Sequence, residues 1–192
     1  GRITGGGGMA EGIDVAALSD DHNPGTANTF KQAGIGIGIL CLIFELSKGI
    51  VPVLSAILVC GYEAVLFPLI MAAPAIGHAF PLFNNFCGGK AIAVTFGVLI
   101  GLAAVEPFPL ILLCGLYLFF SLVVIIDPNE KRTMTTFFLF AAGNMLMFCL
   151  GRLKATVAVG CLCLSLVVLH KNKGKELVTF KDMRLAFFKT DK

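Results

Sequence analysis

The stretch between Lys48 and Asp127 is almost free of formal charge, and this constrains the fold more than any other feature. Only Glu63, Lys90 and Glu106 carry a charge inside it. A soluble domain has charged side chains at about 25% of its positions. The whole chain here reaches only 14%. Because no water-facing surface can be built from such a stretch, the sequence predicts an integral membrane protein.

Six apolar runs follow the polar first 33 residues. The first covers about residues 34–60, which is long enough to cross a bilayer of about 30 Å. The others cover roughly residues 64–83, 90–105, 110–126, 134–150 and 155–169. Several are nearer about 15 residues than about 20, so flanking residues would have to complete them. With no strand alternation or internal repeat, we predict an all-α integral membrane fold, a bundle of six transmembrane helices.

The chain divides into three predicted segments. Residues 1–33 form a polar N-terminal segment, residues 34–170 a transmembrane helical domain, and residues 171–192 a basic tail. Six successive crossings place both terminal segments, the polar residues 84–90 and a charged loop at residues 127–132 on one side. That side holds most of the Lys and Arg, although Arg152 and Lys154 fall opposite, so it is predicted to be cytoplasmic. We therefore expect a multi-pass membrane protein with its site on the cytoplasmic face.

Two classes of function are disfavoured by the cysteines and the tail. The seven Cys lie mostly inside apolar runs without any C-x-x-C pair, which is typical of small buried hydrophobes. We therefore expect neither a disulfide nor a zinc site. The tail after His170 has seven Lys and Arg against three acids, but no nucleic-acid-binding fold surrounds it. It is interpreted as a cytoplasmic membrane flank, and no nucleic-acid partner is expected.

The first polar stretch that could carry chemistry begins at Asn23. Asn23, Pro24 and Gly25 are typical of a type II turn, and such turns can direct backbone N–H groups at an anion. Taken alone, the tripeptide is better explained as an ordinary surface turn. Asn28 and Lys31 follow on a predicted helix start, where residues three apart share one face.

The second polar stretch holds His78 and the sequence Gly88-Gly89-Lys90. Glycines let a phosphate approach the backbone, a helix N-terminus offers free N–H groups, and Lys supplies a cation. Equally, Lys90 can be an anchor at the membrane interface after a flexible loop. His78 can be a general base or a residue that merely bonds a carbonyl at a helix end, and a lone His is more often structural.

Two further groups of polar residues lie at or within apolar runs. Glu45 and Lys48 are three residues apart, so they either form an ion pair on one helix face or Lys48 enters a polar cavity. His170 and Asn172 end the last apolar run, where an ordinary basic flank is the simpler interpretation.

With these residues in view, the chain resembles the PlsY family of membrane acyl-phosphate:glycerol-3-phosphate acyltransferases. Residues 20–31 read DDHNPGTANTFK, where the family motif is GSGNPGATNVxR. Residues 45–52 read ELSKGIVP, against a family pattern DxxKGxxP. Residues 77–93 read GHAFPLFNNFCGGKAIA, against GHxFPxFxxFKGGKGxA. Order and spacing agree over about residues 12–97, and beyond that the resemblance is mostly in hydropathy.

The chain departs from the family motifs at several positions. Asp21 replaces a Ser, Lys31 an Arg, Cys87 a Lys and Ala91 a Gly. Asn172 comes one place early for the family's C-terminal HRxN motif. The family also has a membrane helix before its first motif, so the resemblance implies seven helices in the full protein.

The resemblance implies acyl transfer at the lipid bilayer of the bacterial inner membrane, without cofactor or metal. A fatty acyl-phosphate would donate its acyl group to the 1-hydroxyl of glycerol 3-phosphate, giving lysophosphatidate for phospholipid synthesis. Lys90, His78 and Asp21 are the expected catalytic residues. The expected substrate-binding residues are Asn23, Gly25, Asn28, Lys31, Lys48, Gly88, Gly89, His170 and Asn172.

Asp21 leaves two alternatives open. A carboxylate in place of a hydroxyl repels phosphate unless it is paired, for example with Lys31 or His22. The chain could therefore be a diverged paralogue that binds or acylates another phosphorylated acceptor. A small membrane transporter is the other alternative, ranked last because its paired broken helices in two related halves are missing from the sequence.

Overall fold

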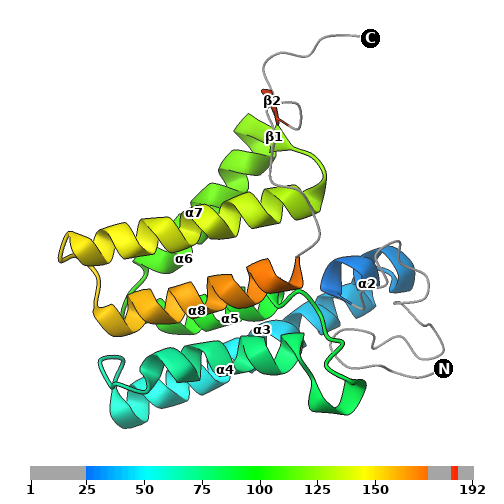
Figure 1. Cartoon of the computed structure of the whole chain (residues 1–192). Coiled ribbons are helices and arrows are strands. Elements are labelled where there is room, and N and C mark those ends of the chain that lie inside the picture. The colour runs from blue at the N-terminus through cyan, green and yellow to red at the C-terminus, as the bar shows by residue number, and fades with distance from the viewer. Residues whose placement is uncertain (1–24, 173–182, 186–192) are drawn as a thin grey trace.

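The protein is a bundle of helices (Figure 1), and its computed structural model describes residues 25–172 and 183–185. The helices are α2 (Thr26–Ala33), α3 (Ile35–Cys60), α4 (Phe67–Ala79), α5 (Ile92–Leu102), α6 (Phe108–Leu118), α7 (Asn129–Cys149) and α8 (Ala155–Lys171). A short 3-10 helix η1 (Leu82–Asn84) and a π-helical turn η2 (Phe119–Val123) follow α4 and α6, respectively. Two three-residue strands, β1 (Val124–Ile126) and β2 (Met183–Leu185), pair antiparallel.

The six predicted apolar helices are all present, as α3 to α8, and the predicted all-α membrane fold is confirmed. Of the described helices, α3 alone is long and apolar enough to cross a bilayer by length and composition; α4, α5, α6 with η2, and α8 are shorter apolar helices. Helix α3 continues through Pro52 without a break. Many large apolar side chains face outward, including Leu58 and Val59, each 86% exposed.

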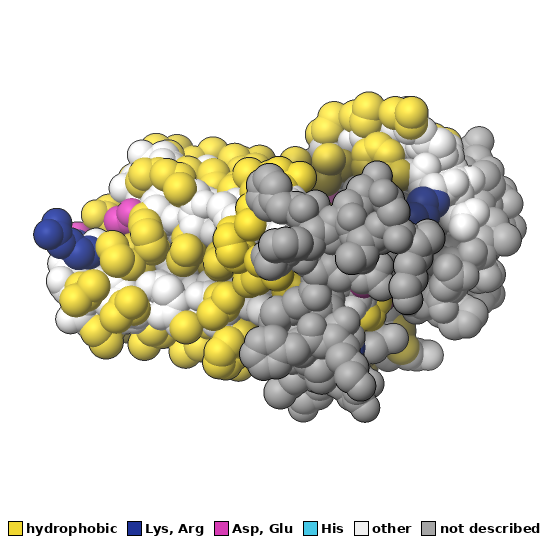
Figure 2. Space-filling view, turned by 90° about the horizontal axis from the view of Figure 1, so that it is seen from above, with side chains coloured by type: hydrophobic (Ala, Val, Ile, Leu, Met, Phe, Trp, Pro, Cys, Tyr) yellow, Lys and Arg dark blue, Asp and Glu magenta, His cyan; other side chains and the backbone are white. Residues whose placement is uncertain are grey.

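The surface agrees with this membrane assignment. On the face seen in Figure 2, hydrophobic side chains cover most of the described surface, and the visible Lys and Arg lie mainly toward its ends. A hydrocarbon environment accepts such a surface, whereas soluble proteins rarely expose apolar patches of this extent.

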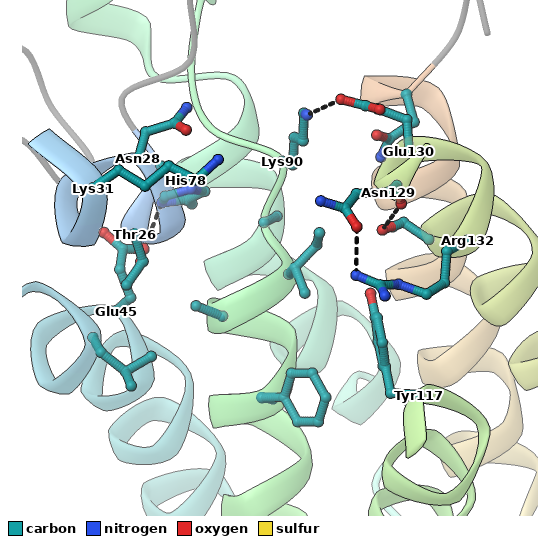
Figure 3. A pocket seen from close by; sticks show the side chains of 18 residues that line it. Thr26, Asn28, Lys31, Glu45, His78, Lys90, Tyr117, Asn129, Glu130 and Arg132 are labelled. Carbon is teal, nitrogen blue, oxygen red and sulfur yellow. Dashed lines mark hydrogen bonds and ion pairs between the residues drawn. The ribbon is translucent and has the colours of Figure 1, made fainter. Parts of the chain in front are cut away.

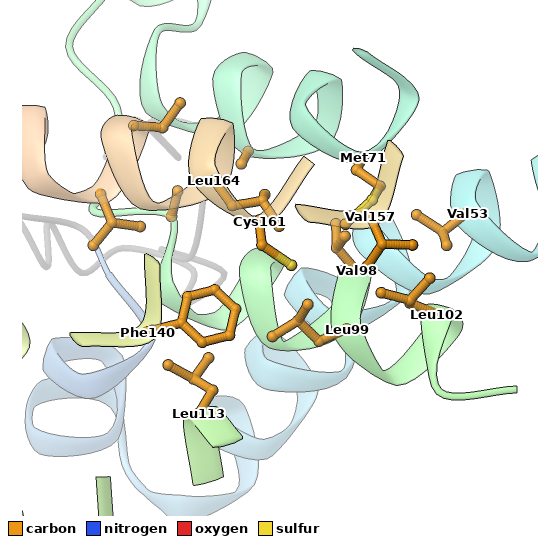
Figure 4. Packing of buried hydrophobic residues seen from close by; sticks show 14 of the residues in the cluster. Val53, Met71, Val98, Leu99, Leu102, Leu113, Phe140, Val157, Cys161 and Leu164 are labelled. Carbon is orange, nitrogen blue, oxygen red and sulfur yellow. The ribbon is translucent and has the colours of Figure 1, made fainter. Parts of the chain in front are cut away.

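The core lies between α3, α4, α5 and α8, with α6 and α7 closing one side (Figure 4). Met71, Leu99 and Phe140 are fully buried in it. Helices α3 and α5 approach very closely because glycines meet at their crossing. A Cβ on Gly49 would lie 2.5 Å from the Val94 carbonyl oxygen. Small residues at such crossings are the usual means of close helix packing in membranes.

Two predicted boundaries are wrong. The fourth apolar run was expected to stay helical to about residue 126, but Val124–Ile126 forms β1. Three β-branched residues shortly before Pro128 disfavour helix and favour strand. Residues 127–132 were expected to form a charged loop, but α7 begins at Asn129, with Glu130 in its first turn.

The two ends of the bundle differ in character. At one end Lys154 forms a 2.9 Å ion pair with Glu63, and the Thr156 hydroxyl donates to the Tyr62 carbonyl at 2.8 Å. The Glu63 carboxylate raises the pKa of the exposed Lys154 ammonium above its usual range. The α3–α4 and α7–α8 turns lie at this end, and α2 and the end of α8 lie at the other (Figure 1).

Candidate active site

A cavity of about 510 Å³ opens at the end of the bundle that carries α2 (Figure 3). Helices α2 to α7, the chain entering α5 and the residue that follows α8 contribute to its wall. The residues lining it are Gly25, Thr26, Asn28, Lys31, Leu42, Glu45, His78, Lys90, Ala91, Ile92, Ala93, Phe96, Tyr117, Asn129, Glu130, Arg132, Thr133 and Asn172. Cations and amides therefore share one cavity with an apolar surface.

The structure brings the two polar stretches of the sequence together. Asn28 and Lys31 face the cavity from α2, three residues apart as predicted, and Gly25 lies at the start of that helix. Lys90 reaches the same cavity from the segment before α5. Residues more than fifty positions apart in the chain can thus contact one small ligand. Asp21 and Asn23, which were also predicted to belong to the site, lie outside the described residues.

Glu45 is the centre of a buried polar group at the wall of this cavity. Its side chain is only 2% exposed, and its two oxygens face different partners. Oε1 lies 2.8 Å from the Lys48 ammonium, and Oε2 lies 2.7 Å from Nδ1 of His78. The ion-pair interpretation of Glu45 and Lys48 is thus the one that the structure bears out. Lys48 does not line the cavity and is half-exposed, so it acts on the cavity only through Glu45.

Gly88 and Gly89 do not line the cavity, contrary to the expectation that a phosphate approaches their backbone. Gly89 is packed against Nε2 of His78, with no room for a Cβ. A Cβ on Gly88 would lie 2.5 Å from Cδ of Pro81 and would also collide with the His78 carbonyl oxygen. The two glycines therefore let this segment pack against the end of α4, which places Lys90.

His78 is held on both sides of its ring. Nδ1 is bound to Glu45, and Nε2 faces Gly89. The ring is thereby held in one orientation at the cavity wall. This arrangement favours a positioning role for His78 over the predicted role of general base.

The C-terminal group of predicted residues is split by the structure. The His170 ring packs on Phe80 at 5.6 Å between centroids, with the Lys171 ammonium 4.9 Å from the same ring, and His170 does not line the cavity. Asn172 does line it. Its Nδ2 donates to the Val168 carbonyl at 2.8 Å, which fixes the buried amide at the end of α8.

The first turns of α7 and one residue of α6 were missed by the sequence analysis. Arg132 donates to Oδ1 of Asn129 at 2.6 Å, and Glu130 lies 3.5 Å from the Lys90 ammonium across the cavity (Figure 3). Tyr117 lines the cavity from α6. A proline followed by a polar residue and an acid is a helix-start signal, and it could have revealed the α7 residues. Among the described residues, no cluster of three His, Cys, Asp or Glu is arranged to hold a metal ion.

A helical bundle with an apolar outer surface and a cation-rich cavity at one end defines a polytopic membrane protein that presents this cavity at a membrane surface. Comparison with known proteins gives the family. The family model described as glycerol-3-phosphate acyltransferase matches residues 7–179. The chain belongs to this family.

Individual relatives agree with this assignment. The glycerol-3-phosphate acyltransferase of Vibrio vulnificus (strain YJ016) is 30% identical over 165 residues, which are 86% of this chain and 76% of that protein. The enzyme of the same name from Macrococcus caseolyticus (strain JCSC5402) is 27% identical over 169 residues, covering 87% and 81%, respectively. A third, from Thioalkalivibrio sulfidiphilus (strain HL-EbGR7), is 39% identical over 82 residues, 43% of this chain and 40% of that protein.

The fold is that of a solved membrane protein. The crystal structure of PlsY (YgiH), an integral membrane glycerol 3-phosphate acyltransferase, in its glycerol 3-phosphate form superimposes with a TM-score of 0.70. Sequence identity is 21%, and the match covers 86% of this chain and 78% of that one. The lysophosphatidic acid form of the same protein gives a TM-score of 0.67. The predicted resemblance to the PlsY family is therefore confirmed.

Proposed function

We propose that the protein transfers a fatty acyl group from acyl-phosphate to the 1-hydroxyl of glycerol 3-phosphate, giving lysophosphatidate and free phosphate. The family supports acylation of glycerol 3-phosphate. The acyl-phosphate donor, the bacterial inner membrane and the cytoplasmic position of the cavity belong to the proposal. In that membrane the reaction would supply phospholipid synthesis.

One observation carries this function: Asn28, Lys31 and Lys90 line the same cavity from two separate parts of the chain. Both substrates carry a phosphate, and these side chains supply two ammonium groups and an amide. The start of α2, at Gly25, adds the positive end of a helix and its free N–H groups. We assign Lys90 to one phosphate and Asn28 with Lys31 to the other.

The apolar part of the wall suits the rest of the donor. Leu42, Ile92 and Phe96 line the cavity beside the polar groups. A fatty acyl chain could pass over them toward the hydrocarbon of the bilayer, while its phosphate stays with the cations. The donor is already activated, so positioning and charge neutralisation can supply most of the rate.

A donor assay tests the proposal directly. The full protein in phospholipid vesicles is given radiolabelled glycerol 3-phosphate with palmitoyl-phosphate, palmitoyl-CoA or palmitoyl-acyl carrier protein. Labelled lysophosphatidate is expected with palmitoyl-phosphate alone. If product forms from a thioester and not from palmitoyl-phosphate, the assigned donor is wrong. No product from any donor, but product with another phosphorylated acceptor, would favour the diverged paralogue.

Glu130 lowers the affinity of the cavity for phosphate in this proposal. Its carboxylate is 3.5 Å from the Lys90 ammonium and so competes with an incoming anion. Glu130→Gln removes the competing charge and keeps the size of the side chain. We expect the KM for glycerol 3-phosphate or for palmitoyl-phosphate to fall about fivefold, equivalent to about 1 kcal/mol.

Steady-state kinetics on both substrates measures this effect. Glu63→Gln is the matched control, because Glu63 has a Lys partner at the opposite end of the bundle. The control should leave both KM values unchanged. An increase in both KM values for Glu130→Gln would mean that Glu130 helps to hold Lys90 in place rather than competing for it.

A further inference from the structure

Five buried polar atoms of cavity-lining residues have no hydrogen-bond partner among the described residues. Oε2 of Glu45 and Nδ1 of His78 face each other in an ion pair, and Oδ1 of Asn172 belongs to an amide that is fixed through its Nδ2. The other two are the hydroxyl oxygen of Tyr117 and Nε of Arg132. A buried polar atom in this condition costs free energy, so its retention calls for an explanation. Since both residues line the cavity, a ligand atom is the natural partner. Both groups can donate a hydrogen bond, so that atom is an acceptor.

Tyr117 is held in a fixed position by its neighbours. Its ring lies 5.7 Å from that of Phe96 and meets Phe137 edge-on at 6.3 Å between centroids. Aromatic contacts on two sides restrict the ring, so the hydroxyl keeps its place beside Thr133 and Arg132. Figure 3 shows the hydroxyl pointing toward Arg132, below the level of Lys90.

Arg132 is held as well. Its terminal Nη2 donates to Oδ1 of Asn129 at 2.6 Å, within the first turn of α7. The guanidinium is thereby fixed while Nε keeps its hydrogen. A neutral O–H from α6 and a cationic N–H from α7 thus stand preorganised on the same part of the wall (Figure 3).

We propose that Tyr117, assisted by Arg132, binds the carbonyl oxygen of the acyl donor. This assignment rests on the function proposed above. A phosphate dianion is better matched by the lysines, whereas a neutral phenol between two aromatic rings suits a carbonyl oxygen. In an acyl-phosphate the carbonyl is one bridging oxygen away from the phosphate. It is also the first group of the apolar chain, and Figure 3 shows the Tyr117 hydroxyl below Lys90 in the cavity.

The reaction explains why hydrogen-bond donors at the carbonyl oxygen are useful. The 1-hydroxyl oxygen of glycerol 3-phosphate bonds to the carbonyl carbon, and the carbonyl electron pair moves onto its oxygen. That oxyanion strengthens its bonds to the Tyr117 hydroxyl and the Arg132 guanidinium. When the carbonyl re-forms, the bond from carbon to the bridging oxygen breaks. Phosphate leaves with the electron pair and, overall, takes up the proton lost by the hydroxyl. Donors directed at the developing charge lower the barrier of such a step.

Tyr117→Phe removes the hydroxyl and keeps the ring contacts. We expect kcat with palmitoyl-phosphate to fall about 10²-fold, because this is the usual loss on removing one such donor. The KM for glycerol 3-phosphate should change less than about twofold. Tyr62→Phe is the matched control, since Tyr62 is the other of the two tyrosines and lies at the opposite end of the bundle. An unchanged kcat for Tyr117→Phe, or a rise in KM alone, would overturn the proposal.

A binding measurement separates this proposal from the proposed function. Palmitoyl phosphonate, with carbon in place of the bridging oxygen and ¹³C at the carbonyl, cannot transfer its acyl group. Its carbonyl stretch, measured by infrared difference spectroscopy in vesicles, should lie at lower frequency in the unaltered protein and in Tyr62→Phe than in Tyr117→Phe. Equal frequencies in all three would overturn the Tyr117 assignment even if transfer occurs. If the carbonyl frequency differs as expected but the unaltered protein has no transfer activity, the Tyr117 assignment is supported and only the proposed reaction is wrong.

Discussion

Lys90→Ala is expected to lower acyl transfer by about 10³-fold, which places it below detection in most assays. A single preorganised donor at a site of developing charge is worth about 10²- to 10³-fold, and Lys90 adds a full positive charge. The packing of Gly88 and Gly89 against α4 also fixes the position of Lys90 at the cavity. The loss should appear in kcat/KM for palmitoyl-phosphate, measured in vesicles.

Two further variants serve as comparisons for Lys90→Ala. Lys154→Ala removes an ammonium that is ion-paired at the opposite end of the bundle, and it should retain full activity. His78→Ala should cost less than Lys90→Ala, because Nδ1 of His78 is directed at Glu45 and the residue mainly positions its neighbours. Activity of Lys90→Ala within tenfold of the unaltered protein, at equal folded yield, would remove the basis of the assigned site.

Gly49→Ala and Gly97→Ala are each expected to destabilise the fold by about 3 kcal/mol. In both, the added Cβ meets main-chain atoms of the facing helix: Val94 and Val98 for Gly49, and Leu46 for Gly97. Backbone cannot turn aside as a side chain can, so α3 and α5 would have to separate. Overpacking of this kind typically costs 1–3 kcal/mol, occasionally more. Thermal unfolding in detergent and the folded yield measure the effect.

Gly115→Ala provides the matched control. Gly115 is also a helical glycine, but nothing lies within 4 Å of its added Cβ. Alanine there should be neutral or stabilise the protein by up to about 1 kcal/mol, because it is the better helix former. If Gly49→Ala and Gly115→Ala unfold at the same temperature, the close crossing of α3 and α5 is wrong.

The sequence predicted the helices well because hydropathy acts locally. Each apolar run became a helix, and errors arose only where local signals compete. At Val124 β-branching and the coming proline outweighed hydropathy. At Asn129 the charges that suggested a loop are the first turn of α7. The predicted pairing of Asn28 and Lys31 on one helix face also depended only on local geometry.

The candidate site was less predictable because its wall is assembled by tertiary packing. The roles of Gly88 and Gly89 depend on how closely α4 approaches them, and no local pattern encodes this. Tyr117 lies in an apolar run, where the pattern predicts that an aromatic residue packs in the core or faces lipid. Its exposure to a cavity follows from how α6 and α7 meet. Likewise, His78 became a positioning residue only once Glu45 and Gly89 were seen on either side of its ring.

Glu45 has a further consequence for how the bundle assembles. In a bilayer, apolar helices can shift along one another at little cost, because hydrophobic burial hardly distinguishes one packing register from the next. A shift of α4 by one turn along α3 would separate His78 from Glu45 and leave a carboxylate half-compensated in hydrocarbon, which is costly. One buried carboxylate thus selects a single register between two helices that could otherwise pack in several.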